Sequence, residues 1–397
     1  MELSPKARLT FRCDLFRGAS QGILETGFQT IALIILVRYF EASATEKSIL
    51  AGANAYGMLL SPFVLHYISR LGWAPSRLAS WFFLSTGAVL LLTLVTTNSL
   101  LFLLSIILAA VLLNQNQPQM VQIYAENYDR RRRGSMLSNS IFLSVIVAMI
   151  YSAAAGRILD FDLALYRLPL MVMVAACVAT YFALRRIPST PGLLPPRRRN
   201  PLNNLSLVWS DRTFGGMLLI WMFMGIGNLM VLPLRVEYMA NPLYGINASN
   251  TQIALMTVIL PAAGRLLTTH LWGYIFDRLN FAKVRTILNS FFLVSILLFF
   301  FTDDLWVMGL ASGLFGIAMG GGGIAWNLWV TKIAPEEKTS AYMSIHVFFT
   351  GIRGVLAPFL GFYLLTFLSP QTVSLVAAFF ISISIFSLVP FIRKFSR

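Results

Sequence analysis

Charged residues are scarce in this sequence, and their scarcity excludes most soluble folds. Only 12% of the 397 residues are Asp, Glu, Lys or Arg, whereas 57% are hydrophobic. A soluble domain has roughly 25% charged residues, and the mean hydropathy of this chain is +0.72. The sequence therefore predicts a membrane protein.

Residues that bind metals or form disulfides are also few. The two cysteines, Cys13 and Cys177, lie far apart, and there are three histidines. Their spacing matches no metal-ligand or redox pattern. We expect no disulfide, no metal and no cofactor.

Motifs of enzyme chemistry are absent as well. No lysine follows a glycine, so the chain lacks the phosphate-binding loop of ATP-driven pumps. It also lacks the HExxH and GxSxG patterns, although His270 and His346 lie in apolar segments. We therefore expect neither an ATP-driven pump nor an enzyme.

Long apolar runs recur from Phe16 to Ile392. Each has about 20 residues, the length that a helix needs to cross a bilayer core of about 30 Å. The sequence predicts an all-α membrane protein with twelve transmembrane helices. We expect these helices near 17–39, 46–69, 78–97, 99–124, 135–158, 166–186, 214–239, 250–275, 285–302, 305–331, 340–367 and 371–392.

A central linker divides the predicted helices into two sets of six. It contains "PSTPGLLPPRRRNP", a composition typical of a connection between domains. The expected organisation is a cytoplasmic N-terminus (1–16), a six-helix bundle (17–186), the linker (187–213), a second bundle (214–392) and a cytoplasmic C-terminus (393–397).

The net charge of +15 belongs to one side of the membrane. Most of the basic residues, such as those at 130–133 and 197–199, fall on the side that carries both termini. By the positive-inside rule this side is cytoplasmic. The charge therefore indicates contact with membrane lipids and not with nucleic acid.

The two halves resemble each other at an offset of about 205 residues. "GMLLSPFVLHYISRLGWAPSR" (57–77) aligns with "GRLLTTHLWGYIFDRLNFAKVR" (264–285), and Arg133 and Gly156 align with Lys338 and Gly361. Parallel repeats of six spans indicate a secondary transporter that binds its solute near the midplane between the halves.

The stretch from Gly273 to Arg285 resembles the signature loop of the major facilitator superfamily. Its pattern is glycine, three residues, aspartate and then basic residues, and the twelve spans, the repeat and the basic linker fit the same family. The first-half copy departs from the pattern, with His66 for the glycine and Ser69 for the aspartate. The resemblance implies the twelve-helix fold of that family and transport by alternating access.

By the same resemblance, this stretch is a gating latch on the cytoplasmic side. We expect Gly273 to allow two helices to pass closely and Asp277 to accept hydrogen bonds from a helix N-terminus. The cations would reach lipid phosphates. The alternative is a simple stop-transfer cluster, which accounts for the cations alone. The latch residues are Gly273, Asp277, Arg278, Lys283 and Arg285.

Four ionisable residues stand out inside predicted spans, where charge is costly and usually functional. Arg265 and Arg353 could bind a carboxylate or phosphate through a planar guanidinium, and Glu25 or His346 could couple transport to protons. A structural ion pair of Glu25 with either arginine is the alternative.

Amide and aromatic side chains add further candidates. The predicted fourth helix contains "NQNQPQMVQ" (114–122), which indicates a polar wall with a kink, or interhelical hydrogen bonds. The tenth contains "GGGGIAWNLW" (320–329), whose four glycines predict a hinge or unwound point. The solute-binding candidates from these segments and the seventh helix are Gln115, Gln119, Asn228, Trp326 and Asn327.

These observations predict a secondary transporter for a small polar or anionic organic solute, coupled to protons. We expect it to act as a monomer in a plasma or bacterial inner membrane, with lipids around it. A multidrug/proton antiporter or an exporter of lipid-like solutes is the alternative, although the fifth helix lacks the Gly/Pro motif of such antiporters, and a non-transporting receptor is a third.

Overall fold

The computed structural model describes residues 4–68, 71–129, 132–191, 205–330, 333–335 and 339–394, without the side chains of some helical residues, including Asp277 and Asn327. The described chain is helical, and strands are absent from these ranges. Eleven of its helical segments are long and apolar enough to cross a membrane. The remaining predicted span, at 46–69, is formed by two helices, α3 (Ala44–Ala51) and α4 (Ala53–Ile68), which are separated at Gly52.

The chain forms two compact units. Unit 1 comprises Met1–Ala42, Ala53–Arg198 and Ser249–Thr251, and unit 2 comprises Ser43–Gly52, Arg199–Ala248 and Gln252–Arg397. Each unit therefore includes a short segment from the other half of the sequence.

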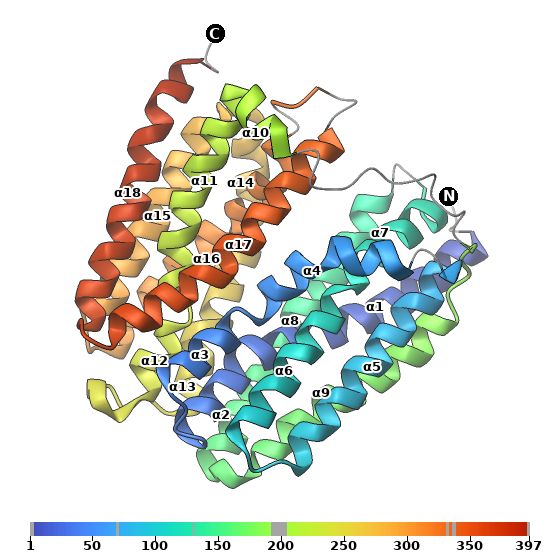
Figure 1. The fold of residues 1–397 in the computed structure, drawn as a ribbon, viewed down its shortest axis with the longest axis horizontal. Helices are drawn as coiled ribbons and strands as arrows, with labels where there is room; N and C mark the ends of the chain where they lie inside the picture. Colours follow the sequence, from blue (N-terminus) through green and yellow to red (C-terminus); the bar gives the residue numbers. More distant parts are fainter. Residues whose placement is uncertain are drawn as a thin grey trace. The chain divides into compact units, whose positions relative to one another are not determined.

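Unit 1 is built on the packing of α1 against α8 and α9, and of α5 against α6 and α9 (Figure 1). The small residues Gly18 and Gly22 bring α1 against the backbone of Ser140 and Ser144, as their small-xxx-small spacing predicts. Besides α4, its elements are α1 (Pro5–Thr26), η1 (Gly27–Ile31), α2 (Ala32–Arg38), α5 (Pro75–Val95), α6 (Ser99–Asn114), α7 (Asn116–Asn127), α8 (Arg133–Phe161), η3 (Leu163–Tyr166) and α9 (Arg167–Arg185).

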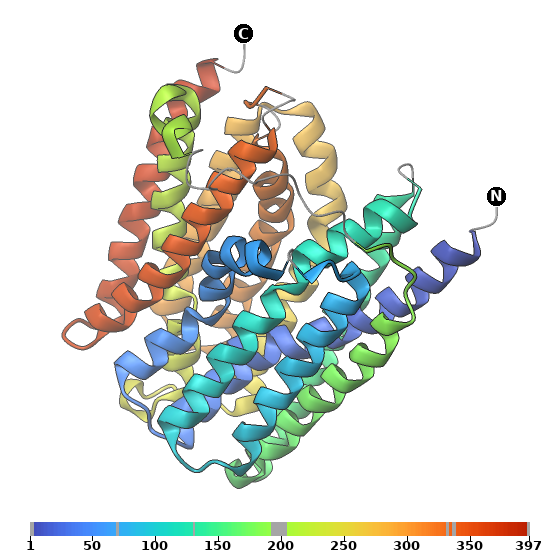
Figure 2. The same ribbon diagram turned by 45° about the vertical axis from the view of Figure 1, so that its right-hand side comes forward.

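Unit 2 packs α14 and α15 on α16, and α11 on α17 and α18 (Figure 2). Its elements after α3 are α10 (Leu207–Ser210), α11 (Arg212–Val231), α12 (Leu234–Ala240), η5 (Pro242–Tyr244), α13 (Asn250–Ala254, whose first two residues belong to unit 1), η6 (Leu255–Ile259), α14 (Leu260–Arg278), α15 (Phe281–Phe300), α16 (Leu305–Leu328), α17 (Thr339–Leu365) and α18 (Pro370–Lys394).

The predicted hinge at the four glycines is wrong. Helix α16 continues through residues 320–323 without a break. Gly320 faces Thr268 and Gly321 faces Trp272 and Leu288 so closely that a Cβ atom would overlap them. The glycines therefore let α14 and α15 approach α16, and this packing offsets their low helix propensity.

The predicted kink in the fourth span is present. Helix α6 ends at Asn114 and α7 begins at Asn116, just before Pro118. Around this break, Gln115 Nε2 donates to Gly57 O at 3.2 Å and Asn114 Nδ2 donates to Asn54 Oδ1 at 3.4 Å. These amide side chains therefore form interhelical hydrogen bonds between the α6–α7 junction and α4.

Candidate functional site

Unit 2 contains a buried cluster of cationic and aromatic side chains, which we call the Trp221 cluster. It draws on four helices, namely α11, α15, α16 and α17. Its members are Trp221, Arg285, Trp326, Trp329, His346 and Arg353.

Arg353 lies near the middle of α17 and is 5% exposed. Its Nη1 donates to Trp221 O on α11, and its Nη2 donates to Thr350 Oγ1 at 3.2 Å. The guanidinium is therefore anchored through Nη1 and Nη2, while its buried Nε–H has no acceptor among the described residues.

Gly225 on α11 makes room for this guanidinium. A Cβ atom at Gly225 would overlap Cδ, Nε and Cζ of Arg353. Trp221, Gly225 and Asn228 are spaced four and three residues apart, so they share one face of α11. That face receives the Arg353 side chain.

Arg285 approaches the same indole from α15. Its guanidinium carbon lies 3.8 Å from the ring centre of Trp221, compared with 5.7 Å for Arg353. Arg285 is 3% exposed, and it forms no ion pair with another described residue. A guanidinium stacked on an aromatic face keeps its N–H donors available at its edges.

His346 is enclosed by three indoles. Its ring centre lies 5.2 Å from that of Trp221 and 5.1 Å from those of Trp326 and Trp329. Neither imidazole nitrogen has a hydrogen-bond partner among the described residues, and the same holds for Nε1 of Trp221 and of Trp329. The cluster therefore holds several buried polar atoms that could bind a ligand.

The cluster has an unbalanced positive charge. Among the described residues, no carboxylate forms an ion pair with Arg285 or Arg353. Both guanidinium carbons are close to one ring, so they lie within roughly 10 Å of each other, where like charges repel by about 2 kcal/mol at an effective dielectric constant of about 20. Such a cost favours the binding of an anion.

Asp211, the acid that contacts the edge of this region, is already engaged. Its Oδ1 caps the N-terminus of α11 by accepting from the backbone N–H groups of Thr213 and Phe214 at 3.0 Å. Its Oδ2 accepts from Tyr342 Oη on α17, also at 3.0 Å. Asp211 therefore fixes α11 against α17 and helps to hold Trp221 and Arg353 in register.

The structure brings together some of the predicted solute-binding residues. His346, Arg353 and Trp326 meet in the Trp221 cluster, and Asn228 lies on the same face of α11, buried and with its Oδ1 unpartnered among the described residues. Arg265 on α14 is half-buried and takes no part in the cluster.

The other predicted candidates lie elsewhere. Glu25 is exposed on α1, where its Oε1 accepts from Gln21 Nε2 at 2.7 Å. Gln115 and Gln119 are buried in unit 1. The side chain of Asn327 lies outside the described residues.

The predicted latch residues divide into two groups. Arg278 and Lys283 are exposed, and the Arg278 guanidinium stacks on Tyr274 at 3.8 Å. The expectation that Arg285 reaches lipid phosphates is wrong, because its side chain is buried against Trp221.

Two further points concern the latch. The close helix approach expected at Gly273 is not present, since among the described residues a Cβ atom there would meet only Ile324 Cδ1, at 4.0 Å. The side chain of Asp277 lies outside the described residues.

Sequence reasoning missed a second buried polar cluster, in unit 1. Asp14 on α1 is fully buried, and its Oδ1 accepts from Arg17 Nε at 2.6 Å and from Tyr124 Oη at 2.7 Å. Arg17 Nη2 also donates to Ser140 Oγ on α8 at 3.1 Å. The sequence predicts residues 1–16, and with them Asp14, as a cytoplasmic N-terminus. In the structure α1 begins at Pro5, so this acid lies inside the helix bundle.

Sequence reasoning also missed Arg235 on α12. It is 2% exposed, its Nη2 donates to Ser295 Oγ at 3.0 Å, and its guanidinium lies between the rings of Phe299 and Phe315. Arg235 comes about four helical turns after Trp221 in the sequence. It therefore belongs to a different region of unit 2.

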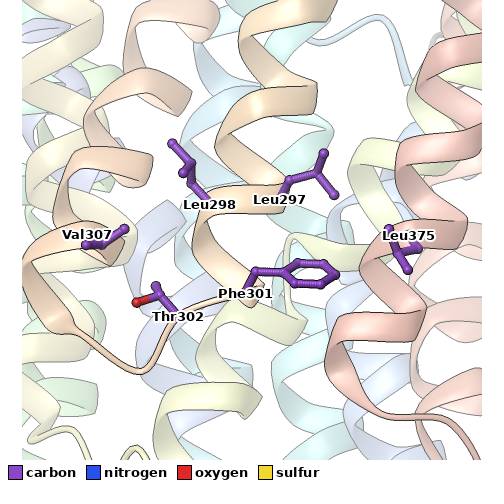
Figure 3. Close-up of a pocket in the computed structure, with 6 residues that line it drawn as sticks. All are labelled: Leu297, Leu298, Phe301, Thr302, Val307 and Leu375. Carbon is purple, nitrogen blue, oxygen red and sulfur yellow. The ribbon is translucent and has the colours of Figure 1, made fainter.

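An apolar pocket of about 500 Å³ lies at the ends of α15, α16 and α18 (Figure 3). It contains none of the candidate residues, and Phe301 and Leu375 in its wall are more than half exposed. This pocket is a hollow in the outer surface of unit 2 and suits a lipid chain better than a polar solute. Its lining residues are Leu297, Leu298, Phe301, Thr302, Val307 and Leu375.

Comparison with solved structures shows a shared fold along almost the whole chain. The nucleoside transporter NupG matches with a TM-score of 0.74 at 11% identity, over 98% of this chain and 99% of that one. A bacterial homologue of the human lysosomal transporter Spinster matches with a TM-score of 0.72 at 12% identity, over 99% and 98%. A D-xylose–proton symporter matches with a TM-score of 0.68 at 14% identity, over 98% and 97%.

Sequence comparison finds a family match in the second half of the chain. Residues 236–395 match the profile described as Major Facilitator Superfamily. No curated protein sequence matches the chain significantly.

The match of residues 236–395, together with the shared fold, confirms the resemblance to the major facilitator superfamily that was drawn from the signature loop and the repeat. It also confirms the fold class, a multi-pass, all-helical membrane protein. The superfamily and these neighbours indicate a membrane transporter and not an enzyme.

Proposed function

We propose that the chain is a secondary transporter that moves a small anionic or strongly polar organic solute by alternating access, coupled to protons. One observation carries the anionic preference. Arg285 and Arg353 converge on Trp221, buried and without a carboxylate partner among the described residues. A bound anion would relieve their repulsion and accept their free N–H donors.

Within this proposal the residues have different roles. Arg285 and Arg353 bind the anionic group, the indoles of Trp221, Trp326 and Trp329 pack against the organic part, and His346 contacts the solute or a proton. Asn228, two turns along α11 from Trp221, extends the polar face. Arg265 lies outside the cluster, so the structure does not support the solute-binding role that its place inside a predicted span indicated.

Proton coupling has independent but weaker support. The D-xylose–proton symporter shares the fold, and ionisable side chains inside membrane spans commonly serve as proton relays. We propose His346 as the first candidate because it lies among the solute-binding residues, and Glu25 as the second.

The remaining sequence-based expectations complete the proposal. We propose a monomer in a bacterial inner or plasma membrane, with both termini cytoplasmic and six-helix domains at 17–186 and 214–392. Asp277, Arg278 and Lys283 form the cytoplasmic latch.

Uptake into proteoliposomes tests the function. Wild-type protein should accumulate at least one member of a set of labelled organic anions, and an inward proton gradient should change the rate. Arg353→Gln should raise the half-saturating concentration by about tenfold or more, the effect of losing a charge-assisted hydrogen bond, while Arg265→Gln should have a smaller effect. Equal affinity in the wild type and Arg353→Gln for every transported anion would contradict the proposal.

The same assay separates the alternatives. A multidrug/proton antiporter or an exporter of lipid-like solutes would transport cationic or uncharged amphiphiles and would tolerate Arg353→Gln. A receptor would bind its ligand without accumulating it.

A further inference from the structure

The charge of the Trp221 cluster also points to the charge of its solute. Resting on the function proposed above, we propose that the solute bound at the Trp221 cluster is a small organic dianion, that is, a dicarboxylate or a phosphate monoester with a compact apolar part.

The first argument is the charge balance inside unit 2. Arg285 and Arg353 are permanently charged, and both are at least 95% buried. The carboxylate at the edge of the region, Asp211, is already used by the α11 N-terminus and Tyr342. A monoanion would leave one buried guanidinium uncompensated, whereas a dianion neutralises both.

The second argument is the separation of the two binding edges. Arg353 has used Nη1 and Nη2 on Trp221 O and Thr350 Oγ1, so Nε remains for a ligand. Arg285 makes no hydrogen bond within the described part of the chain and can offer a two-pronged edge. The two arginines come from different helices and lie at different distances from the Trp221 ring, so two anionic groups fit them better than one.

The third argument is the number of further unpartnered polar atoms. Trp221 Nε1, Trp329 Nε1 and both nitrogens of His346 lack partners among the described residues. Together with the free N–H groups of the two arginines, they provide more hydrogen-bonding groups than one carboxylate can use, since a carboxylate accepts about four hydrogen bonds. The indole rings between these atoms suit a compact apolar or aromatic spacer.

Matched pairs of anions test this proposal on the purified full-length protein. Phthalate is compared with monomethyl phthalate, and succinate with monomethyl succinate, at equal ionic strength and neutral pH. Binding is followed by the rise in melting temperature with ligand concentration. At least one dianion should bind about tenfold more tightly than its monoester, because it makes a second charge-assisted contact. The affinity for phenyl phosphate is compared with that for phthalate, and the tighter binder shows whether the site prefers a phosphate monoester or a dicarboxylate.

Arginine variants link the preference to the cluster. Arg285→Gln and Arg353→Gln should each abolish the preference for the dianion while weakening the monoester by less than about threefold, since one cation then remains. Arg235→Gln is the matched control, because it removes a buried guanidinium of unit 2 outside the cluster, and it should keep the preference. If a Gln variant does not fold, Arg353→Lys and Arg285→Lys keep the charge and should keep most of the preference.

The outcomes separate this inference from the function on which it rests. If anions bind through Arg285 and Arg353 but dianion and monoester bind equally, the proposal of a dianionic solute is wrong and the proposal of an anion transporter stands. If no anion stabilises the protein, or if the Gln variants bind as the wild type does, both proposals fall. A dianion preference that Arg235→Gln also abolishes would overturn the inference as well.

Discussion

Two buried clusters, one in each unit, treat charge in opposite ways. In unit 1, Asp14 and Arg17 form an ion pair supported by Tyr124 and Ser140. In unit 2, Arg285 and Arg353 are buried beside Trp221 without an ion-pair partner among the described residues. One cluster is neutral by itself and the other is not.

The contrast is informative because both clusters occupy matching parts of the sequence repeat. The offset of about 205 residues relates α1 to α11, α7 to the end of α16, and α8 to α17. At that offset Tyr124 corresponds to Trp329. Corresponding helices thus hold a structural ion pair in one half and open binding groups in the other, although Asp14 and Arg17 themselves align with Leu219 and Met222.

Breaking the ion pair of unit 1 should have the largest effect on stability. Asp14→Asn leaves the guanidinium of Arg17 buried without its partner, which typically costs about 3–5 kcal/mol. The check is the unfolding midpoint in detergent, with Glu25→Gln as the control, since Glu25 is an exposed acid of the same helix. The double variant Asp14→Asn/Arg17→Gln should recover part of the loss. A midpoint equal to that of Glu25→Gln would show that the pair does not stabilise unit 1.

The matching change in unit 2 should affect binding more than stability. Arg353→Gln loses the hydrogen bonds to Trp221 O and Thr350 Oγ1 but also removes the repulsion from Arg285. These effects oppose each other, so we expect a net loss below about 2 kcal/mol without solute. The same unfolding assay measures it. A loss as large as that of Asp14→Asn would mean that Arg353 is a structural residue and not one held for a ligand.

Gly225→Ala should test how tightly Arg353 is positioned. The added methyl overlaps the guanidinium, and crowding of this kind typically costs about 1–3 kcal/mol. Anion affinity should fall with stability because Arg353 must move. Gly216→Ala on the same helix is the control, since its Cβ would lie 3.2 Å from Cζ of the Phe391 ring, which can shift. Unchanged anion affinity in Gly225→Ala would show that the position of Arg353 is unimportant for binding.

The fold and part of the site could be predicted from the sequence. Apolar runs of bilayer length determine the helices, and His346 and Arg353 were found because an ionisable residue inside a span is costly. The four glycines misled the prediction, because their helix propensity is poor but their packing against Trp272 and Leu288 was not visible in the sequence.

Arg285 and Asp14 show where sequence reasoning stops. Arg285 and Lys283 both lie in the first turns of α15, but residues two apart point to nearly opposite faces of a helix. Lys283 is therefore exposed while Arg285 reaches Trp221. Helical spacing within this basic run was the available signal. Asp14 was missed because α1 extends about three turns before the first apolar run.

The smallest effect should come from the exposed arginine of the same segment. Arg278→Gln removes a cation–π contact with Tyr274 on the surface, worth about 0.5–1 kcal/mol. Its unfolding midpoint should change little, and the affinity for phthalate should stay that of the wild type, whereas Arg285→Gln should weaken phthalate by about tenfold. Both variants remove one positive charge from one short stretch, so any difference between them arises from burial beside Trp221. Equal loss of phthalate affinity in the two variants would mean that the basic stretch attracts anions through its overall field and that Arg285 has no special contact with them.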